Sequence, residues 1–387
     1  MHIRNRNAIV RPKSPSRAFV SLLLLILFGF PKHSPAEPLR ELIFQPGSTS
    51  FASSHASTLI ELKDGSIMAA WFGGTAEGKP DVAIWFSRRP ANLPTAAWSK
   101  PIELAREPNV ACWNPVLFYT RDAQRKDDRL WLYYKFGTGP QSWTASRKYS
   151  DDEGKTWSPA EHLPAGLIGP VRAKPLVLPD STIVSGSSTE SYHSWAVWIE
   201  RSTDKGKTWS KIGPIVPPTD LPRIPGSTGA RISAQTPGDA DWKQTEGIIQ
   251  PSVVSLGGKH LRFYARSTEK TARVVVADSY NDGMTWTPAH SIEIPNPNSG
   301  IDAVSLKDGR IILIYNNTTT GRTPLNLAIS SDAEHFTMFS TLESQPGEYS
   351  YPSMIQAKNG DLCITYTWDR KSIRYLRIPL SDLPKKP

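Results

Sequence analysis

The chain has 387 residues, of which 21% are charged and 39% hydrophobic, and a formal net charge of +9. Six of its Lys and Arg residues and no acidic residue lie within the first 36 positions, so residues 37–387 carry only +3. So small an excess gives little reason to propose nucleic acid as a partner. Two thiols cannot make a structural zinc site, and a disulfide between Cys112 and Cys363 is permitted but not implied.

The N-terminus has the pattern of a signal peptide. A basic stretch ends at Arg17, an apolar run covers residues 18–30, and Ser34-Pro35-Ala36 follows. The run is too short to span a bilayer, and no later segment approaches the roughly 20 apolar residues that spanning requires. We therefore expect residues 1–36 to be removed and the mature protein to be secreted or periplasmic, with no membrane span.

Three copies of the motif S-x-[DN]-x-G-x-T-W follow one another along the chain. They begin at Ser150, Ser202 and Ser279, and weaker relatives lie at residues 330–336 and before Trp98. Ser and Asp or Asn side chains satisfy turn backbone groups, Gly allows a positive φ, and Trp packs beneath. The motif therefore predicts tight hairpin turns whose role is structural.

A second repeat, a turn followed by a strand, is interleaved with the first. Its six strands are expected at residues 66–71, 129–134, 181–185, 260–265, 310–315 and 361–366. Units of roughly 50 to 77 residues, with short strands and almost no helical periodicity, are typical of four-stranded propeller blades. The sequence thus predicts an all-β fold, a single six-bladed β-propeller over residues 37–387.

Connectivity within a blade predicts a functional rim. The innermost strand pairs with the second, so the start of the first and the end of the second lie on one rim. The inner strands are expected to start at His55, Asn114, Lys174, Gln250, Ser299-Gly300 and Tyr351. Around the ends of the second strands lie Glu77, Asp81, Glu190, Arg266, Arg322 and Arg370. We expect these polar residues to converge around the axis.

On these motifs the chain resembles the sialidase superfamily, specifically its bacterial and plant BNR-repeat, sialidase-like group. The resemblance covers most of the mature chain. Sialidases pair a Tyr nucleophile with a Glu, use a separate Asp as acid/base and clamp the substrate carboxylate with three arginines. The resemblance implies that Tyr351 is the nucleophile, that Arg266 and Arg322 are clamp residues, and that Asp81 is the acid/base, with Glu77 as its competitor.

Two positions depart from the sialidase pattern. His55-Ala56-Ser57 stands where sialidases read Arg-Ile-Pro, so histidine replaces the first clamp arginine. Gln250-Pro251 stands where the Glu that activates the Tyr is expected. Glutamine can orient a phenol but cannot take its proton. Double displacement then requires that Glu190 or Glu246 reach Tyr351.

Three functions are compatible with this pattern. The first is hydrolysis of a sialic-acid-like or uronic-acid glycoside, with Tyr351 attacking the anomeric carbon and Asp81 protonating the leaving oxygen. The second is a polysaccharide lyase in which His55 and Tyr351 act as base and acid while Lys174 or an Arg stabilises the enolate-like charge. The third is a glycan-binding propeller without turnover.

The remaining rim residues have alternative structural roles. Asn114, Glu190 and Arg370 join Lys174 as candidate substrate contacts, yet rim Arg residues also form ion pairs between blades, and His55 can bind neighbouring backbone. The sequence contains no metal-binding or nucleotide-binding motif. We expect no cofactor, an acidic oligosaccharide or polysaccharide as the substrate, and a monomer.

Overall fold

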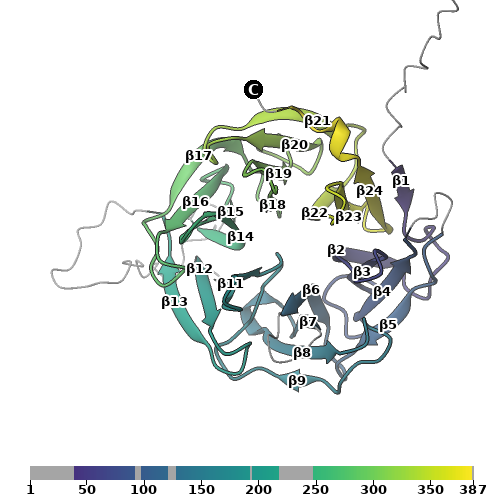
Figure 1. Cartoon of the computed structure of the whole chain (residues 1–387). Coiled ribbons are helices and arrows are strands. Elements are labelled where there is room, and N and C mark those ends of the chain that lie inside the picture. Colours follow the sequence, from purple (N-terminus) through teal and green to yellow (C-terminus); the bar gives the residue numbers. More distant parts are fainter. Residues whose placement is uncertain (1–38, 92–96, 121–127, 192–193, 218–246, 386–387) are drawn as a thin grey trace, which may run out of the picture. The chain divides into compact units, whose positions relative to one another are not determined.

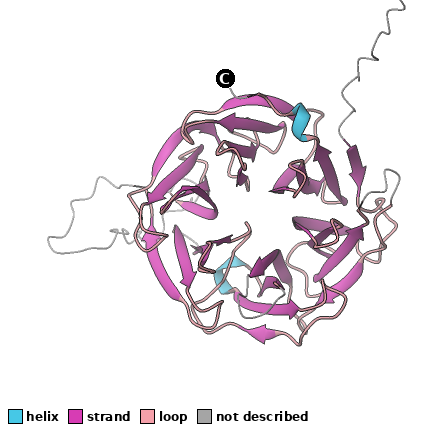
Figure 2. Ribbon diagram, viewed as in Figure 1, coloured by secondary structure: helices cyan, strands magenta, loops and turns pink. Residues whose placement is uncertain are grey.

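Six four-stranded antiparallel sheets arranged as a ring make up the fold (Figure 1). The computed structural model describes residues 39–91, 97–120, 128–191, 194–217 and 247–385. Figure 2 shows strands through most of these residues, with short 3-10 helices at Pro140–Ser142 and Leu380–Asp382. The predicted all-β, six-bladed β-propeller is confirmed. The expected signal peptide lies outside the described residues.

The blades are numbered along the chain. Blade 1 consists of β2 (Ser53–Glu61), β3 (Ile67–Gly74), β4 (Ala83–Arg89) and β5 (Ile102–Ala105). Blade 2 consists of β6 (Cys112–Thr120), β7 (Arg129–Phe136), β8 (Thr144–Ser150) and β9 (Glu161–His162). Blade 3 consists of β10 (Leu176–Val177), β11 (Ile183–Glu190), β12 (Trp195–Ser202) and β13 (Ser210–Ile215).

The second half of the ring repeats this plan. Blade 4 consists of β14 (Ile248–Gly257), β15 (His260–Ser267), β16 (Arg273–Ser279) and β17 (His290–Pro295). Blade 5 consists of β18 (Asp302–Ser305), β19 (Ile311–Tyr315), β20 (Leu325–Ser330) and β21 (Thr337–Glu343). Blade 6 consists of β22 (Tyr349–Gln356), β23 (Leu362–Trp368), β24 (Ser372–Ile378) and, on its outer edge, β1 (Leu39–Leu42).

Blade 6 closes the ring with strands from both ends of the described chain. β1 pairs antiparallel with β24, with Leu39 opposite Arg377 and Leu42 opposite Arg374. The sequence analysis did not predict this pairing, because the first strand precedes the first repeat unit. Closure removes the exposed edge that β24 would otherwise offer to another chain.

The hydrophobic core is divided among the boundaries between neighbouring blades. One cluster joins Phe72 of blade 1 to Leu132 of blade 2, and another joins Ile314 of blade 5 to Tyr366 of blade 6. Four further clusters occupy the other boundaries. Because strand side chains alternate between the two faces of a sheet, each blade packs against both neighbours. The ring therefore holds the inner strands in fixed positions.

The six second strands begin within two residues of their predicted positions, whereas each inner strand begins about two residues from its predicted start. In blades 1, 2, 4 and 6 the inner strand begins two residues earlier than expected, and in blades 3 and 5 it begins two residues later. The four longer strands carry a β-bulge, at which the pairing shifts register. The bulge residues have positive φ: Ala56 (54°), Asn114 (38°), Gln250 (55°) and Tyr351 (50°).

These bulges explain where the rim side chains point. An extra residue in one strand bends it and re-aims its side chain. A left-handed conformation costs a residue other than glycine about 1–2 kcal/mol, so the surrounding structure has to hold it in place. Asn114, Gln250 and Tyr351 occupy this position, whereas His55 precedes it by one residue. His55 and Tyr351 therefore occupy different positions relative to the bulges of their strands.

The S-x-[DN]-x-G-x-T-W motifs form turns between third and fourth strands, as predicted. In the first motif Ser150 Oγ accepts a 2.7 Å hydrogen bond from Gly154 N, and Asp152 Oδ1 accepts one of 2.9 Å from Thr156 N. Gly154 has a φ of 72°, which favours glycine. Trp157 Nε1 donates to the carbonyl of Gly154. The other two copies repeat these contacts.

Three further observations concern membrane spans, metal sites and the two cysteines. No helix within the described ranges is long and apolar enough to cross a membrane. Among the same residues, no group of three or more His, Cys, Asp or Glu side chains is arranged to hold a metal ion. Cys112 and Cys363 are buried free thiols.

Candidate active site

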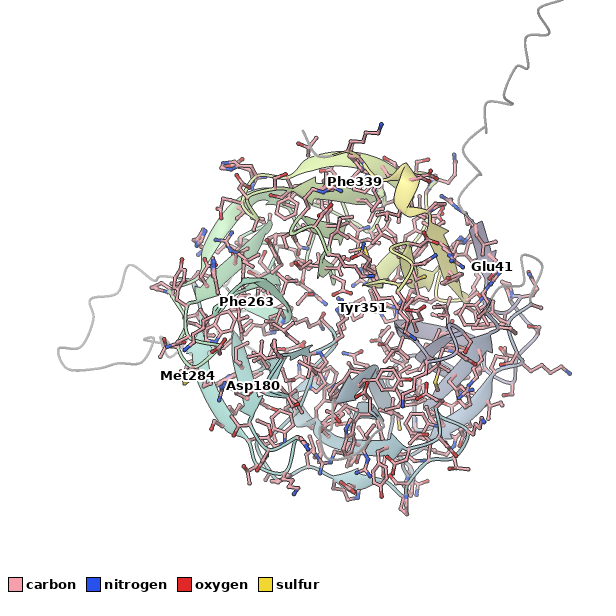
Figure 3. The ribbon with its side chains drawn as sticks, in the orientation of Figure 1. Glu41, Asp180, Phe263, Met284, Phe339 and Tyr351 are labelled. Atoms are coloured by element: carbon pink, nitrogen blue, oxygen red, sulfur yellow. The ribbon has the colours of Figure 1, made fainter. Side chains whose placement is uncertain are left out.

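Tyr351 lies near the centre of the ring, where the blade 6 bulge directs it (Figure 3). Its side chain is partly exposed, so a ligand can reach it. The phenol oxygen accepts a 2.8 Å hydrogen bond from Arg266 Nη1 at the end of β15, and Gln250 Nε2 lies 3.4 Å from the same oxygen. Two predicted side chains of blade 4 thus meet the phenol oxygen of a residue of blade 6.

Three guanidinium groups surround the ring of Tyr351. The Cζ atoms of Arg322, Arg266 and Arg172 lie 5.5, 5.7 and 5.8 Å from its centroid. Arg266 is fixed further by Asn298 Oδ1 at 2.7 Å and Gln250 Oε1 at 3.2 Å. Two of these arginines were predicted. The sequence analysis missed Arg172, although it lies only two residues before Lys174.

His55 packs against Tyr351 with ring centroids 4.3 Å apart. The imidazole is only 1% exposed, and its Nδ1 is hydrogen-bonded to Thr367 Oγ1 at 2.9 Å. Burial first, and then the charges of Arg370, Arg322, Arg266 and Arg172, hold the pKa of His55 well below its ordinary value. Histidine is therefore neutral at physiological pH. Its Nε2 is buried and has no hydrogen-bond partner among the described residues.

Two carboxylates and two arginines form an ion-pair network beside this group. Glu348 Oε1 accepts a 3.0 Å hydrogen bond from Arg322 Nη1, and its Oε2 accepts one of 2.9 Å from Arg370 Nε. Arg370 also donates to Glu77. Burial alone would raise the pKa of Glu348, but the hydrogen bond from Arg370 and both arginine charges hold it below its ordinary value. Glu348 was not predicted.

Glu190 lies at the end of β11, next to Gln250 and Arg266. Burial raises its pKa to about 6, against the opposing effects of the Arg266 charge and a hydrogen bond with Gln250. Its Oε1 is buried without a hydrogen-bond partner in the described part of the chain. A carboxyl group in this state exchanges a proton close to neutral pH.

A family model described as a BNR repeat-like domain matches residues 65–364. The chain belongs to this family. The match confirms the resemblance to the BNR-repeat, sialidase-like group inferred from the sequence motifs. No curated protein sequence matches the chain.

Solved structures similar to this BNR repeat-like protein include two sialidases. The NanB sialidase from Streptococcus pneumoniae is 14% identical, with a TM-score of 0.65 over 89% of this chain and 71% of its own. The Hadza microbial sialidase Hz136 is 15% identical, with a TM-score of 0.67 over 89% and 69%. A protein of unknown function from Dyadobacter fermentans is 15% identical, with a TM-score of 0.68 over 88% and 97%. At these identities the likeness shows the sialidase propeller fold.

The other predicted residues of the BNR repeat-like protein make their contacts away from the phenol. Lys174 Nζ forms a 2.9 Å ion pair with the buried Asp302, and Asn114 Nδ2 donates to the carbonyl of Val171 at 3.2 Å. Asp81 is exposed on the loop between β3 and β4, where it accepts hydrogen bonds from the backbone and hydroxyl of Thr75. The Thr75 hydroxyl is the main cause that lowers the pKa of Asp81.

The sequence analysis missed two residues of the site, Arg172 and Glu348, and only Arg172 could have been predicted from its position. Arg172 belongs to the segment before β10, and a charged residue beside a predicted inner-strand start was a usable signal. Glu348 precedes β22 by one residue, outside both positions that the blade pattern marks as part of the rim. Its role follows only from the folded position of Arg370, which comes from the next hairpin of the same blade.

Proposed function

We propose that this protein is a sialidase-type glycoside hydrolase that cleaves an acidic glycan, with Tyr351 as its nucleophile. The hydrogen bond from Arg266 to the phenol oxygen carries the proposal. A donor that is charged stabilises negative charge on this oxygen as its proton leaves, and the partly exposed ring is open to a ligand. The sialidase propeller fold supports the same reading.

The arginines favour a substrate with a sugar carboxylate. Arg322 and Arg370 have side chains 25% and 30% exposed, and both reach the carboxylate of Glu348. Guanidinium groups bind carboxylates through paired, charge-assisted hydrogen bonds. A sialic-acid-like or uronic-acid residue would present such a group to the same pair of arginines.

Two carboxyl groups, those of Glu190 and Asp81, are assigned the proton transfers. As Tyr351 attacks the anomeric carbon, its phenol proton leaves and the glycosidic C–O bond breaks. Glu190 is best suited to take this proton, because its pKa is about 6 and it shares Gln250 with the phenol. Asp81 is the donor to the leaving oxygen that the sialidase resemblance implies. Water then releases the sugar from tyrosine.

A polysaccharide lyase is the second candidate, favoured by the neutral imidazole of His55. An unprotonated Nε2 beside Tyr351 is the form in which histidine can remove the proton next to a uronate carboxylate. Tyr351 would then protonate the leaving oxygen, and the arginines would stabilise the enolate-like charge.

Product analysis separates the two candidates. Purified protein is incubated with 4-methylumbelliferyl N-acetylneuraminate and with uronate oligosaccharides, and products are followed by mass and by absorbance of the unsaturated uronate. A product that has gained water supports the hydrolase. Unsaturated product without added water supports the lyase. Binding without any product, retained in a Tyr351→Phe variant, would contradict both and indicate a glycan-binding protein.

A further inference from the structure

We propose that Arg172 is a positioning residue for Tyr351, which holds the blade 6 bulge in place and supplies a buried positive charge next to the phenol. The inference deepens the proposed function, since it rests on Tyr351 being the reacting group. Arg172 is 3% exposed and cannot itself bind a substrate by its guanidinium face. Its action therefore passes through the residues that it contacts.

The first part of the argument is the hydrogen bonding of the guanidinium. Arg172 Nη1 donates to the carbonyl of Pro352 at 2.7 Å, and Nη2 donates to the carbonyl of Ile301. Pro352 directly follows Tyr351, whose φ of 50° is unfavourable for a bulky residue. A side chain from blade 3 thus reaches blades 5 and 6 and fixes the peptide that follows the nucleophile.

The surrounding chain leaves room for this side chain. A Cβ atom at Gly300 would lie 3.3 Å from Arg172 Nε and 3.5 Å from Gln250 Oε1. The first separation is tighter than most real contacts, so a larger residue there would displace the guanidinium. Glycine at this position, just before β18, therefore allows Arg172 to cross to Pro352.

The second part of the argument is the charge. The hydrogen-bond acceptors of Arg172 are neutral backbone carbonyls, and its Nε has no hydrogen-bond partner among the described residues. Burial lowers the pKa of Arg172, while Asp302 and Tyr351 oppose this effect. Burying a cation without a hydrogen-bonded carboxylate is costly. A neutral hydrogen-bond donor would be enough to hold the two backbone carbonyls in place. The retained charge acts on the phenol and on His55.

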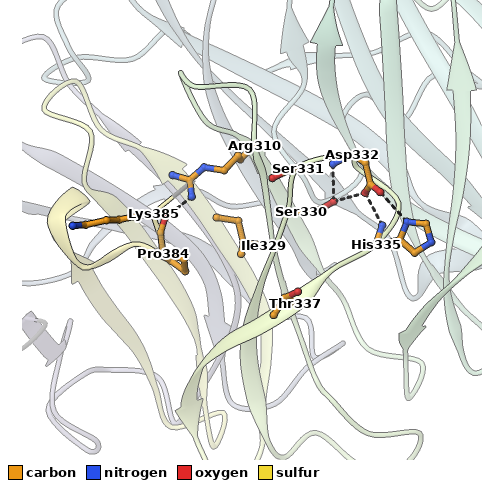
Figure 4. A pocket seen from close by; sticks show the side chains of 9 residues that line it. All are labelled: Arg310, Ile329, Ser330, Ser331, Asp332, His335, Thr337, Pro384 and Lys385. Atoms are coloured by element: carbon orange, nitrogen blue, oxygen red, sulfur yellow. Dashed lines mark hydrogen bonds and ion pairs between the residues drawn. The ribbon is translucent and has the colours of Figure 1, made fainter. Parts of the chain in front are cut away.

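The experiment compares two variants of Arg172 with a matched control. Arg172→Gln removes the charge. Arg172→Lys keeps the charge but lacks the planar guanidinium that donates to both carbonyls. Arg310→Gln is the control, because Arg310 is also a buried guanidinium that donates to a backbone carbonyl, that of Pro384 (Figure 4). Unlike Arg172, it is paired with a carboxylate, that of Asp308. Arg310 lies at the turn before β19 of blade 5, on the rim of the ring opposite that of Tyr351.

Two measurements are made on each variant. The first is kcat and KM for 4-methylumbelliferyl N-acetylneuraminate. The second is the pH titration of the His55 imidazole by NMR, assigned from the signal that disappears in H55Q. The charged groups that face this imidazole are Arg370, Arg322, Arg266 and Arg172, while Thr367, Tyr351 and Phe72 contact it as neutral groups.

The expected results separate the two roles. R172Q should lower kcat by about 100-fold, the loss typical of a misplaced reacting group, with little change in KM. It should also raise the pKa of His55, because a nearby cation is removed. R172K should restore the titration of His55 but not kcat. R310Q should leave both measurements unchanged even where its thermal stability falls as far as that of R172Q.

Two outcomes would overturn the inference. One is that the His55 titration of R172Q, like that of the R310Q control, equals that of the wild type. The other is that R172Q changes thermal stability alone, with kcat unaltered. If the wild type does not turn over the sialoside, the proposed function fails on that substrate, yet the NMR titration still tests the charge of Arg172.

Discussion

The imidazole of His55 and the phenol ring of Tyr351 lie 4.3 Å apart, centroid to centroid, although 296 positions separate them in the sequence. Blades 1 and 6 are neighbours only because the ring closes. The pair combines a phenol that receives a hydrogen bond from Arg266 with an imidazole that burial, and then the charges of four arginines, keep neutral. The predictions for Tyr351 and His55 follow from this juxtaposition.

Replacing Tyr351 by phenylalanine should abolish turnover. The variant keeps the ring and its packing but removes the attacking oxygen, so we expect kcat to fall by about 10³-fold or more. Initial rates with the fluorogenic sialoside check this. Tyr349→Phe is the matched control, since Tyr349 is buried in the same strand and precedes the bulge. Equal losses in the two variants would exclude a specific role for Tyr351.

The burial of neutral His55 should make the protein less stable in mild acid. Its pKa is lowered in the folded state, so the unfolded chain binds more protons as the pH falls below the ordinary histidine value of about 6.5. This group makes the free energy of unfolding decrease by at most about 1.4 kcal/mol per pH unit below that value.

Denaturant unfolding at several pH values between about 5 and 7.5 measures this slope. The slope should be smaller in H55Q than in the wild type. His335 provides a contrast, because its exposed imidazole is hydrogen-bonded to Asp332 and its pKa is raised. H335Q should therefore not reduce the slope, and an unchanged slope in H55Q would contradict the burial of a neutral histidine.

The pH profile of catalysis should depend on Glu190. With a pKa of about 6, this carboxyl is deprotonated above that pH and can accept the phenol proton, so kcat should rise through pH 6. E190Q should lower kcat and remove this rise. Rate measurements from about pH 4.5 to about pH 8, which extend to both sides of the pKa of Glu190, test this prediction. E293Q, an exposed site on β17, should retain the wild-type profile; a rise that persists in E190Q assigns it to another group.

Arg322 should recognise the substrate carboxylate. The wild type is expected to prefer a sialoside over its carboxylate methyl ester, and R322Q should lose about 10- to 100-fold of that preference. The measured quantity is the ratio of kcat/KM for acid and ester. Arg40→Gln is the control, because Arg40 lies on the outer strand β1 and pairs with Glu343. A preference that survives in R322Q would show that Arg322 does not contact the carboxylate.

The repeated motif should affect stability without affecting catalysis. Asp204 accepts hydrogen bonds from the backbone and hydroxyl of Thr208, so D204A should lower the free energy of unfolding by about 1–2 kcal/mol. D204N should cost less, because the third copy of the motif makes the equivalent backbone contact with Asn281. Thermal unfolding checks both variants. A large fall in kcat of folded D204N would contradict a structural role.

The features that the sequence predicted are those set by local patterns. Turn residues and alternating strands define each blade, and the second strand could be placed to within two residues. In blades 1, 2, 4 and 6 the start of the inner strand was misplaced by two residues, because a β-bulge depends on pairing with the next strand, which the pattern of one strand does not show. Gln250 and Tyr351 were nevertheless identified, since the blade repeat marks them directly.

The site residues that were missed depend on longer contacts. Arg172 becomes part of the site only because its side chain crosses from blade 3 to the backbone of blades 5 and 6. Glu348 becomes part of it through Arg322 and Arg370. The spacing of the repeats encodes neither relationship, because Arg172 reaches across the ring and Glu348 meets side chains from two other loops of blades 5 and 6.

The pairing of β1 with β24 has a consequence for biosynthesis. A ribosome-bound chain that has emerged only through blade 5 already contains Arg172, Arg266 and Arg322 but not Tyr351. The proposed nucleophile, Tyr351, arrives with the last blade, whose sheet is completed only when β24 pairs with β1. In the proposed mechanism the site is therefore complete only once the last blade has been made, and a chain that ends before blade 6 lacks Tyr351.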